Sequence, residues 1–432
     1  QAIAPGARFA GMKLPELLAP AGNREQLEAA LLYGADAVYL GGGELSLRAA
    51  RGFGDDDLEE ALRLCRAGGA RLYYCLNAFP RQGQLGRVAA RLEQLAALGV
   101  DGCIVADPGV LRLARRLCPA LPIHMSTQAN TCNAEAVAFW QEQGACRVNL
   151  ARELPLREIR AVLRACPGLE TECFVHGALC LALSGQCLLS AWLNERPANL
   201  GQCTQPCRYE YRPLTRTGDD RAVGAALEHP ASLVVEEATR PGEALWEVTR
   251  EGDYGALWAP EDICLIRYAT WFVRVGISAL KIEGRMRTGG YVAHAVDAYR
   301  TALSDLASGA FRSGLYVEEL RRASLRPMGT GFFLPRRRAV GGAAARAALL
   351  ARLEEPAGDD AWHISVRGRW EAANPAVLLL PGLRRPVLAP GTYALENHRG
   401  ERVRTLHPGM RGLLRCAAPS AARGIYVRAV AP

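Results

Sequence analysis

The chain has 432 residues, of which half are hydrophobic and 22% are charged. A chain of this length and composition can bury a large core, so we expect two or three folded domains and exclude a disordered or low-complexity protein. The formal net charge of +8 permits contact with a polyanion such as RNA but does not require one.

The fourteen cysteines are interpreted as reduced thiols. A chain this long folds without disulfides and no secretory signal opens the sequence, which predicts a cytoplasmic protein. The longest apolar run, residues 178–193, is interrupted by polar residues and is shorter than the roughly 20 residues that span a bilayer, so no membrane segment is expected. Residues 1–13 lack periodicity and are interpreted as a disordered extension.

Eight short apolar runs recur along the chain, and amphipathic segments of helical period separate them. In chain order they are ELLAPAG near Leu17, DAVYLGG near Val38, RLYYCLN near Tyr73, DGCIVAD near Ile104, PIHMSTQ near Ile123, CRVNLAR near Val148, LETECFVHG near Cys173 and SALKIEG near Leu280. Eight strand–helix units predict an α/β fold, a (β/α)8 TIM-like barrel over residues 14–323. The alternative is a doubly wound sheet, but no GxGxxG turn follows the first run.

Polar side chains at the ends of the predicted strands are the candidate site, because barrel enzymes place their chemistry there. The candidate catalytic residues are Glu172, His176, Lys281, Glu283 and Arg285, and the candidate substrate-binding residues are His124 and Arg152. Further polar residues at strand ends are Tyr39, Asn77, Asp107, Gln128 and Glu153. Alternation along the last strand places Lys281, Glu283 and Arg285 on one side. If that side is the interior, either an ion-pair network or a bound anion must compensate the charges.

A long insertion, residues 177–277, separates the seventh and eighth strands and contains a group of cysteines. If their segment is helical, Cys180 and Cys187 lie on one face about 10.5 Å apart along the axis. That separation is wide for one zinc ion and suits different corners of an iron–sulfur cluster. Cys203, Cys207 and Cys264 follow, and the other nine cysteines stand singly, where small buried hydrophobic residues are expected.

Three stretches resemble one known family. ECFVHGALCLALSGQCLLS, residues 172–190, is similar to the defining motif of peptidase family U32, the collagenase-like peptidases. ELLAPAGNREQLEAALLYGADAVYLGG and SALKIEGRMRTGGYVAHAVDAYR resemble that family's first and last barrel segments. The resemblance, over residues 14–300, implies a barrel and, despite the peptidase label, oxygen-independent hydroxylation of RNA or quinone with a [4Fe–4S] cluster.

Carried over residue by residue, the resemblance implies that Cys180, Cys187, Cys203 and Cys264 bind the cluster, with Cys207 as an alternate ligand. The segment VVEEATRPGE, residues 234–243, resembles the branch that makes 5-hydroxyuridine at the tRNA wobble position. That branch implies tRNA as substrate, a small anionic oxygen donor for which prephenate is a candidate, and an electron-transfer partner. Arg152, Lys281 and Arg285 would suit such a donor.

Two other function classes stay open. A peptidase would need an activated nucleophile or a catalytic metal, and the sequence has neither an HExxH helix nor a GxSxG turn. His176 and Cys180 could pair as base and nucleophile, but a cysteine bound to iron could not attack a peptide. A non-catalytic RNA-binding chaperone with a structural cluster is the third class.

Residues 324–432 have a different character. Short alternating runs such as AWHISVRGRW and GTYALENHRG are divided by Pro–Gly turns, which predicts a small β-barrel domain. This part resembles the translation-factor-like β domain found in many members of the same family. It could bind RNA or could serve only as a packing module.

Overall fold

The computed structural model describes residues 12–42, 45–46, 52–179, 261–324, 326–334, 339–341, 347–358, 360–416 and 421–430, and the backbone of three strands between residues 233 and 256. Most of the expected extension, residues 1–11, lies outside this described part. None of the described helices is long and apolar enough to cross a bilayer.

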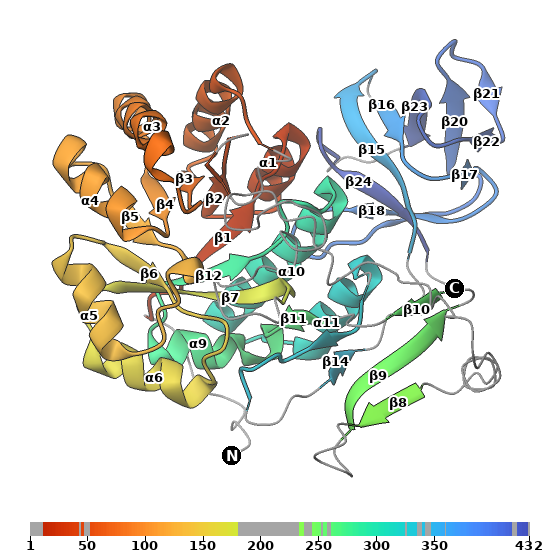
Figure 1. Cartoon of the computed structure of the whole chain (residues 1–432). Coiled ribbons are helices and arrows are strands. Elements are labelled where there is room, and N and C mark those ends of the chain that lie inside the picture. The colour runs from red at the N-terminus through yellow and green to blue at the C-terminus, as the bar shows by residue number, and fades with distance from the viewer. Residues whose placement is uncertain are drawn as a thin grey trace, which may run out of the picture.

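All eight predicted strands are present and form a closed parallel barrel (Figure 1). They are β1 (Glu16–Pro20), β2 (Ala37–Leu40), β3 (Arg71–Leu76), β4 (Gly102–Val105), β5 (Ile123–Met125), β6 (Arg147–Asn149), β7 (Glu170–Ala178) and β12 (Ala279–Ile282). Each strand pairs in parallel with the next, and β12 pairs with both β7 and β1. The predicted TIM-like barrel is therefore confirmed.

Helices follow the strands and cover the outside of the barrel. They are α1 (Arg24–Leu32), α2 (Asp55–Ala67), α3 (Leu85–Leu98), α4 (Pro108–Leu117), α5 (Ala134–Glu142), α6 (Leu156–Ala165), α9 (Ala269–Val275), α10 (Gly289–Ser308) and α11 (Ser313–Ala323). Side-chain oxygens of Asn23, Asp107 and Thr288 accept backbone N–H bonds at the first turns of α1, α4 and α10. These caps satisfy donors that the helices leave free, which fixes where the helices begin.

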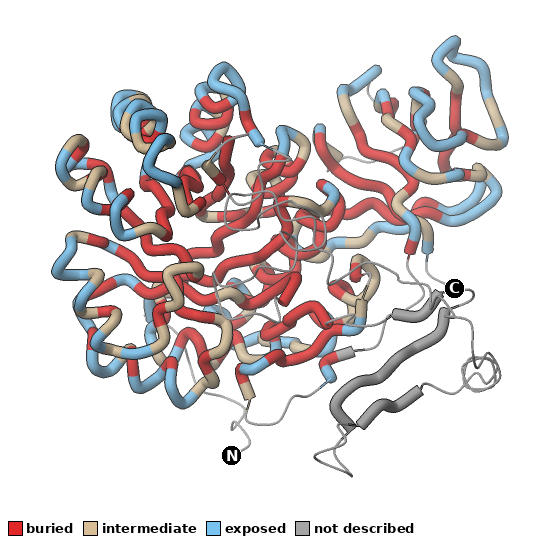
Figure 2. The backbone as a smooth tube through the Cα atoms, viewed as in Figure 1, coloured by how far each residue is buried: buried red, intermediate tan, exposed pale blue. Residues whose placement is uncertain are grey.

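Side-chain alternation divides the barrel residues between two environments. Leu17 and Ala19 of β1 belong to the large core between strands and helices, whereas Leu18 belongs to a small cluster inside the barrel. The other members of the inner cluster are Ala37, Tyr39, Tyr73, Cys75 and Ile104. Figure 2 shows the barrel strands as buried along most of their length, and because successive side chains point to opposite faces, both faces of the sheet are covered. The inner cluster is small, so other inward positions are left for polar side chains.

Three short strands outside the eight extend the barrel sheet. β11 (Asp262–Cys264) pairs antiparallel with the end of β7, β13 (Met328–Gly329) pairs with β11, and β14 (Ala339–Gly341) pairs with β13. β13 and β14 follow residue 324, where the sequence places the start of the second domain. A separate antiparallel sheet contains β8 (Leu233–Glu236), β9 (Ala244–Glu251) and β10 (Tyr254–Ala256).

The predicted C-terminal β domain is present as an antiparallel sheet of eight strands, in the order β19-β18-β24-β15-β16-β23-β20-β21. Its strands are β15 (Leu349–Pro356), β16 (Ala361–Val366), β18 (Ala376–Leu379), β19 (Val387–Leu388), β20 (Tyr393–Asn397), β21 (Arg402–Val403), β23 (Arg411–Cys416) and β24 (Tyr426–Ala429). A small pair, β17 (Trp370–Glu371) and β22 (Thr405–Leu406), lies beside it. Trp370 is buried and donates to the Tyr393 hydroxyl, which joins the pair to the sheet.

Buried ion pairs join the β domain to α10 and α11. Asp297 accepts from Arg385 at 2.6 Å and from the backbone N–H of Gly382 at 2.7 Å. Glu319 accepts from Arg385 at 2.9 Å and from Arg428 at 3.1 Å. Because the carboxylates and the guanidinium groups come from different domains, the two domains hold each other in a fixed position.

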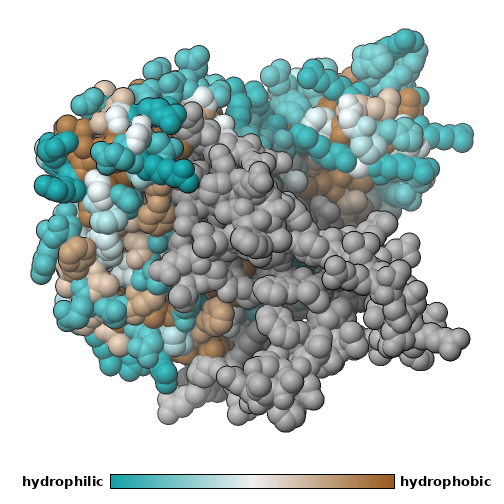
Figure 3. Space-filling view, viewed as in Figure 1, coloured by the Kyte–Doolittle hydropathy of each residue, from teal (hydrophilic) through white to brown (hydrophobic). Residues whose placement is uncertain are grey.

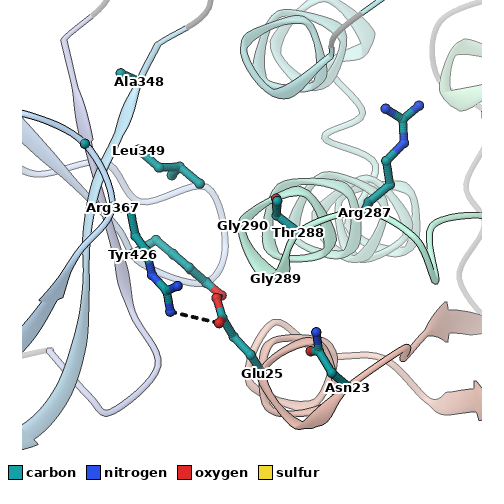
Figure 4. A pocket seen from close by; sticks show the side chains of 11 residues that line it. Asn23, Glu25, Arg287, Thr288, Gly289, Gly290, Ala348, Leu349, Arg367 and Tyr426 are labelled. Atoms are coloured by element: carbon teal, nitrogen blue, oxygen red, sulfur yellow. Dashed lines mark hydrogen bonds and ion pairs between the residues drawn. The ribbon is translucent and has the colours of Figure 1, made fainter. Parts of the chain in front are cut away.

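A cavity of about 550 Å³ lies at the same junction (Figure 4). The N-termini of α1 and α10 line one side, and Leu349, Arg367 and Tyr426 of the β domain line the other. Glu25 of α1 reaches across, accepting from Arg367 at 2.8 Å and from the Tyr426 hydroxyl at 2.7 Å.

Candidate active site

The barrel interior contains a buried ion-pair network. Lys281 of β12 donates to Glu172 of β7, with 2.7 Å between Nζ and Oε1, and Asn149 of β6 donates to the same oxygen at 2.8 Å. Arg147 of β6 lies 3.6 Å from the other Glu172 oxygen and 2.6 Å from Glu16 of β1. All five residues are buried. The structure therefore brings two predicted catalytic residues, Glu172 and Lys281, into direct contact.

The same network extends to the N-terminal end of the barrel. Arg147 contacts the half-exposed Glu170 at 2.6 Å, and the Tyr73 hydroxyl donates to Glu16 at 2.9 Å. The sequence analysis missed Glu16 and Arg147 because it considered only residues at strand ends on the opposite face. A charged residue at an inward position of an apolar strand was the signal that could have identified both.

Three basic side chains surround two aromatic rings at the C-terminal side of this network. The Lys281 ammonium lies 4.4 Å from the centre of the Tyr39 ring and 5.3 Å from that of Phe174. Arg285 lies 5.8 Å from the Tyr39 ring, and Arg152 lies 4.6 Å from the Phe174 ring. The predicted residues Lys281, Arg285 and Arg152 therefore share one region, where cation–π contacts hold positive charge close together.

Several buried polar atoms inside the barrel have no hydrogen-bond partner among the described residues. They are Nδ1 of His124, Oδ1 of Asn149 and Nε of Arg152. Burial, together with the charges of Arg147 and Lys281, holds the pKa of His124 well below its usual range, so the imidazole is neutral at pH 7. A lysine with three N–H donors, of which Glu172 accepts one, can bind an anion here.

Glu283 and His176 are placed apart from Lys281. Glu283 follows the end of β12, and its carboxylate accepts from the backbone N–H of Ala178 at 3.4 Å. The His176 ring stacks at 5.8 Å on Tyr291 and contacts Tyr299, both of α10. Burial lowers the pKa of His176 to about 3, which makes this imidazole neutral as well.

Of the predicted cluster ligands, only Cys264 lies in the described part of the chain; Cys180, Cys187, Cys203 and Cys207 lie outside it. Cys264 is a free, fully buried thiol on β11, aligned with His176 of β7. Burial raises the pKa of this thiol to about 12, and a bound metal ion would be needed to keep it ionised. Its chemistry and dry surroundings fit a ligand of an iron–sulfur cluster.

The described residues alone do not form a metal site, because no group of three or more His, Cys, Asp or Glu side chains is arranged to hold an ion there. The nine cysteines expected to be small buried residues divide into three groups. Seven are buried, Cys132 is half-buried and Cys146 is exposed. The prediction is wrong for Cys146, which lies directly before β6 at the surface end of that strand.

The profile of peptidase family U32 matches residues 22–341, which is most of the chain. The chain belongs to this family. It is 36% identical over 314 residues to tRNA hydroxylation protein P of Escherichia coli, covering 68% of this chain and 69% of that protein. It is also 36% identical over 325 residues to tRNA hydroxylation protein P1 of Bacillus subtilis, covering 74% and 71%.

Less similar proteins bear other names. A collagenase of Porphyromonas gingivalis is 28% identical over 337 residues, covering 74% of each chain. The 23S rRNA 5-hydroxycytidine C2501 synthase of E. coli is 32% identical over 288 residues, covering 67% of this chain and 39% of that protein. A solved structure of the U32 peptidase Mk0906 aligns with a TM-score of 0.39 at 15% identity, covering 65% of this chain and 97% of that one.

Proposed function

We propose that this chain hydroxylates the wobble uridine of tRNA to 5-hydroxyuridine without molecular oxygen, in the cytoplasm. The observation that carries the proposal is the 36% identity, over about two thirds of the chain or more, to two proteins named for tRNA hydroxylation. The rRNA synthase and the collagenase are less similar, and they make rRNA hydroxylation and peptide hydrolysis the alternatives.

The barrel interior supports a small anionic co-substrate in this proposal, such as a carboxylate of the prephenate class. Lys281 and Arg152 would bind the carboxylate. Arg285 lies beside the same Tyr39 ring as Lys281 and would add positive charge there. Glu172 would orient Lys281, because it accepts one of the three ammonium hydrogens. His124 is neutral and has an unpartnered Nδ1, so it would bind a polar group of the co-substrate.

A [4Fe–4S] cluster is part of the proposal, with Cys180, Cys187, Cys203 and Cys264 as ligands and Cys207 as the alternate. When bound, such a cluster would supply electron transfer or activation of the substrate. An electron-transfer partner would then dock near the cluster. The buried His176 and Tyr299 pack beside β11 and would keep water away from Cys264. Glu283 would hold the end of β7, from which the chain continues to Cys180.

The test is nucleoside mass spectrometry of tRNA from a strain that lacks the gene, with and without a plasmid-borne copy of this chain. We expect 5-hydroxyuridine-derived nucleosides to disappear in the deletion strain and to return with the copy. If tRNA is unchanged while a hydroxylated rRNA base is lost, the substrate is rRNA. If neither RNA changes, hydroxylation of RNA is excluded and peptide hydrolysis becomes the function to assay.

A further inference from the structure

The net charge of the chain is concentrated in residues 361–432. This segment contains eleven arginines, three glutamates and no lysine or aspartate, which gives the same +8 as the whole chain. Removing them from the 52 basic and 44 acidic residues leaves 41 of each in residues 1–360. Residues 1–360 are therefore neutral as a whole, and residues 361–432 of the C-terminal domain carry a net charge equal to that of the whole chain.

Part of this charge has a structural role. Arg385 and Arg428 are paired with Glu319 at the domain junction, Arg415 pairs with Glu396 at 2.5 Å, and Arg369 pairs with Glu371 at 2.7 Å. Charges that are already paired contribute little attraction for a partner molecule.

Four other arginines are exposed, and none of them has an ion-pair partner in the described part of the chain. We call them the basic end; they are Arg399, Arg402, Arg404 and Arg411. The β20–β21 hairpin aligns Arg402 with Glu396, and β23 aligns Arg411 with Ser365 of β16. Strand pairing therefore fixes the backbone at Arg402 and Arg411 within one sheet, and Arg399 and Arg404 lie in the short segments on either side of β21. Figure 3 shows hydrophilic side chains over much of the visible surface of the described β domain.

Backbone hydrogen bonds connect the basic end to the strand that leads to the domain junction. The backbone of Val366 exchanges hydrogen bonds with the turn before Arg411, donating to Met410 at 3.0 Å and accepting from Gly409 at 2.9 Å. The next residue, Arg367, is exposed and lines the junction cavity, as Arg287 does on the barrel side (Figure 4). Both guanidinium groups are already paired, Arg367 with Glu25 at 2.8 Å and Arg287 with Asp262 at 2.7 Å, so the unpaired positive charge stays at the basic end.

The kind of side chain exposed at the basic end distinguishes between types of nucleic acid. Proteins that bind single strands combine positive charge with exposed aromatic rings on which bases stack. In the described residues from β15 to the end of β24 and Val430, the exposed large hydrophobic side chains are Val387, Met410 and Val430, and none is aromatic; the exposed Phe332 precedes β15 and follows β13 of the barrel sheet. Guanidinium groups without stacking rings fit phosphates of a folded, helical RNA backbone.

We propose that the basic end is the surface by which this protein binds the phosphate backbone of folded RNA, which under the proposed function is tRNA. Arg399, Arg402, Arg404 and Arg411 contact phosphates and give affinity without reading sequence. The β domain is fixed to the barrel by the ion pairs of Asp297 and Glu319, so RNA held by these arginines has a defined position relative to the barrel.

The test is binding of an unmodified tRNA transcript to the full chain over a range of salt concentrations. The variant replaces the four arginines of the basic end by alanine. The matched control replaces four exposed, unpaired arginines on α4 and α6 by alanine, namely Arg112, Arg116, Arg160 and Arg164. Both variants lose the same charge from exposed positions, and their Tm values should equal that of the wild type.

We expect the basic-end variant to bind tRNA at least about 10-fold more weakly, and the magnitude of its slope of log K against log salt to fall by roughly 3.6, since each of the four phosphate contacts contributes about 0.9. The control should keep the wild-type slope. Equal losses in both variants, or full affinity in the basic-end variant, would overturn the proposal.

Two further outcomes are distinguishable. Binding of the wild type to vesicles of phosphatidylglycerol and phosphatidylcholine, with no binding to tRNA, would overturn the RNA proposal and identify a membrane surface as the partner. Loss of tRNA binding in the basic-end variant, with unchanged nucleosides in the deletion strain, would support this surface and exclude the proposed hydroxylation. The binding assay therefore tests the RNA-binding surface separately from the proposed hydroxylation, and either proposal can be wrong without the other.

Discussion

Lys281 of β12 and Glu172 of β7 form an ion pair inside the barrel, with 2.7 Å between the charged atoms and at most 4% of either side chain exposed. The pair crosses the seam where the last strand closes the barrel. Because water cannot replace either partner, removing one leaves a buried charge without its counter-charge.

Lys281→Met should therefore lower the free energy of unfolding by about 3 kcal/mol, since a buried carboxylate loses its partner. Glu172→Gln together with Lys281→Met should recover much of that loss. Urea unfolding of both single variants and the double variant gives the coupling energy. The exposed pair Arg157 and Glu158 is the control and should show coupling below about 1 kcal/mol. Additive effects at Lys281 and Glu172 would contradict a direct interaction.

Lys281→Ala should reduce tRNA modification much more than tRNA binding, because the proposal places this lysine at the small anion and not at the RNA. We expect at least a 10-fold loss of modified nucleoside, with tRNA affinity within about twofold of the wild type. Nucleoside mass spectrometry and the tRNA titration measure the two quantities. A parallel loss of both would show that Lys281 acts through the fold or through RNA contact.

Gly22→Ala should disturb the segment after β12 without removing any charged group. A Cβ atom at residue 22 would lie 2.1 Å from the carbonyl oxygen of Arg285, so the backbone must move. We expect a loss of about 1–3 kcal/mol in stability, as for other overpacked sites, and lower modification activity. Gly83→Ala, where a Cβ would meet no atom within 4 Å, is the control. Equal stability of the two variants would contradict the close approach.

His294 of α10 should make stability depend on pH at the domain junction. Its Nδ1 contacts the Gly290 carbonyl oxygen at 2.8 Å, which requires a hydrogen there, and Nε2 lies 3.3 Å from Arg428. Burial lowers the pKa of His294 to about 4; the positive charges of Arg428 and Arg385 act in the same direction, and the charge of Glu319 opposes them. The neutral imidazole that accepts from Arg428 is therefore the folded form at neutral pH.

Between pH 6.5 and about 4 the unfolded chain binds a proton at His294 and the folded chain does not. Stability from this group is therefore complete above pH 6.5 and is lost as pH falls to about 4, by up to roughly 3 kcal/mol. The urea midpoint of His294→Gln should change less with pH across this range than that of the wild type. The exposed His398→Gln variant should keep the wild-type profile. Identical profiles for His294→Gln and the wild type would contradict the assignment.

Cys180→Ala, Cys187→Ala, Cys203→Ala and Cys264→Ala should each abolish iron retention, because a cluster that lacks one thiolate exposes an iron to solvent. Cys65→Ala and Cys166→Ala should retain it. The measurement is iron and sulfide content with the visible spectrum of protein purified without oxygen. A colourless protein with one zinc, or loss in Cys207→Ala with retention in Cys264→Ala, would revise the ligand set. Equal loss in both groups would indicate misfolding.

The sequence predicted the barrel well because parallel strands buried on both faces read as short apolar runs. It did not predict β11, β13 and β14, which have two or three residues each; β11 pairs with the end of β7, β13 with β11, and β14 with β13. At the site, Glu172 and Lys281 could be predicted from their positions in strands. Their mutual contact could not, because it depends on which strands become neighbours when the barrel closes.

The closure of the barrel by β12 also has a consequence for how the chain folds. Glu16 of β1 aligns with Ala279 of β12, so the first barrel strand pairs with a strand that lies more than 260 residues later in the chain. Contacts so distant in sequence form slowly. At about 5–20 residues per second, the ribosome needs on the order of 5–20 s to pass from the end of β7 to β12. During that time β1 and β7 are open sheet edges, and chaperone protection of those edges should matter most in this interval.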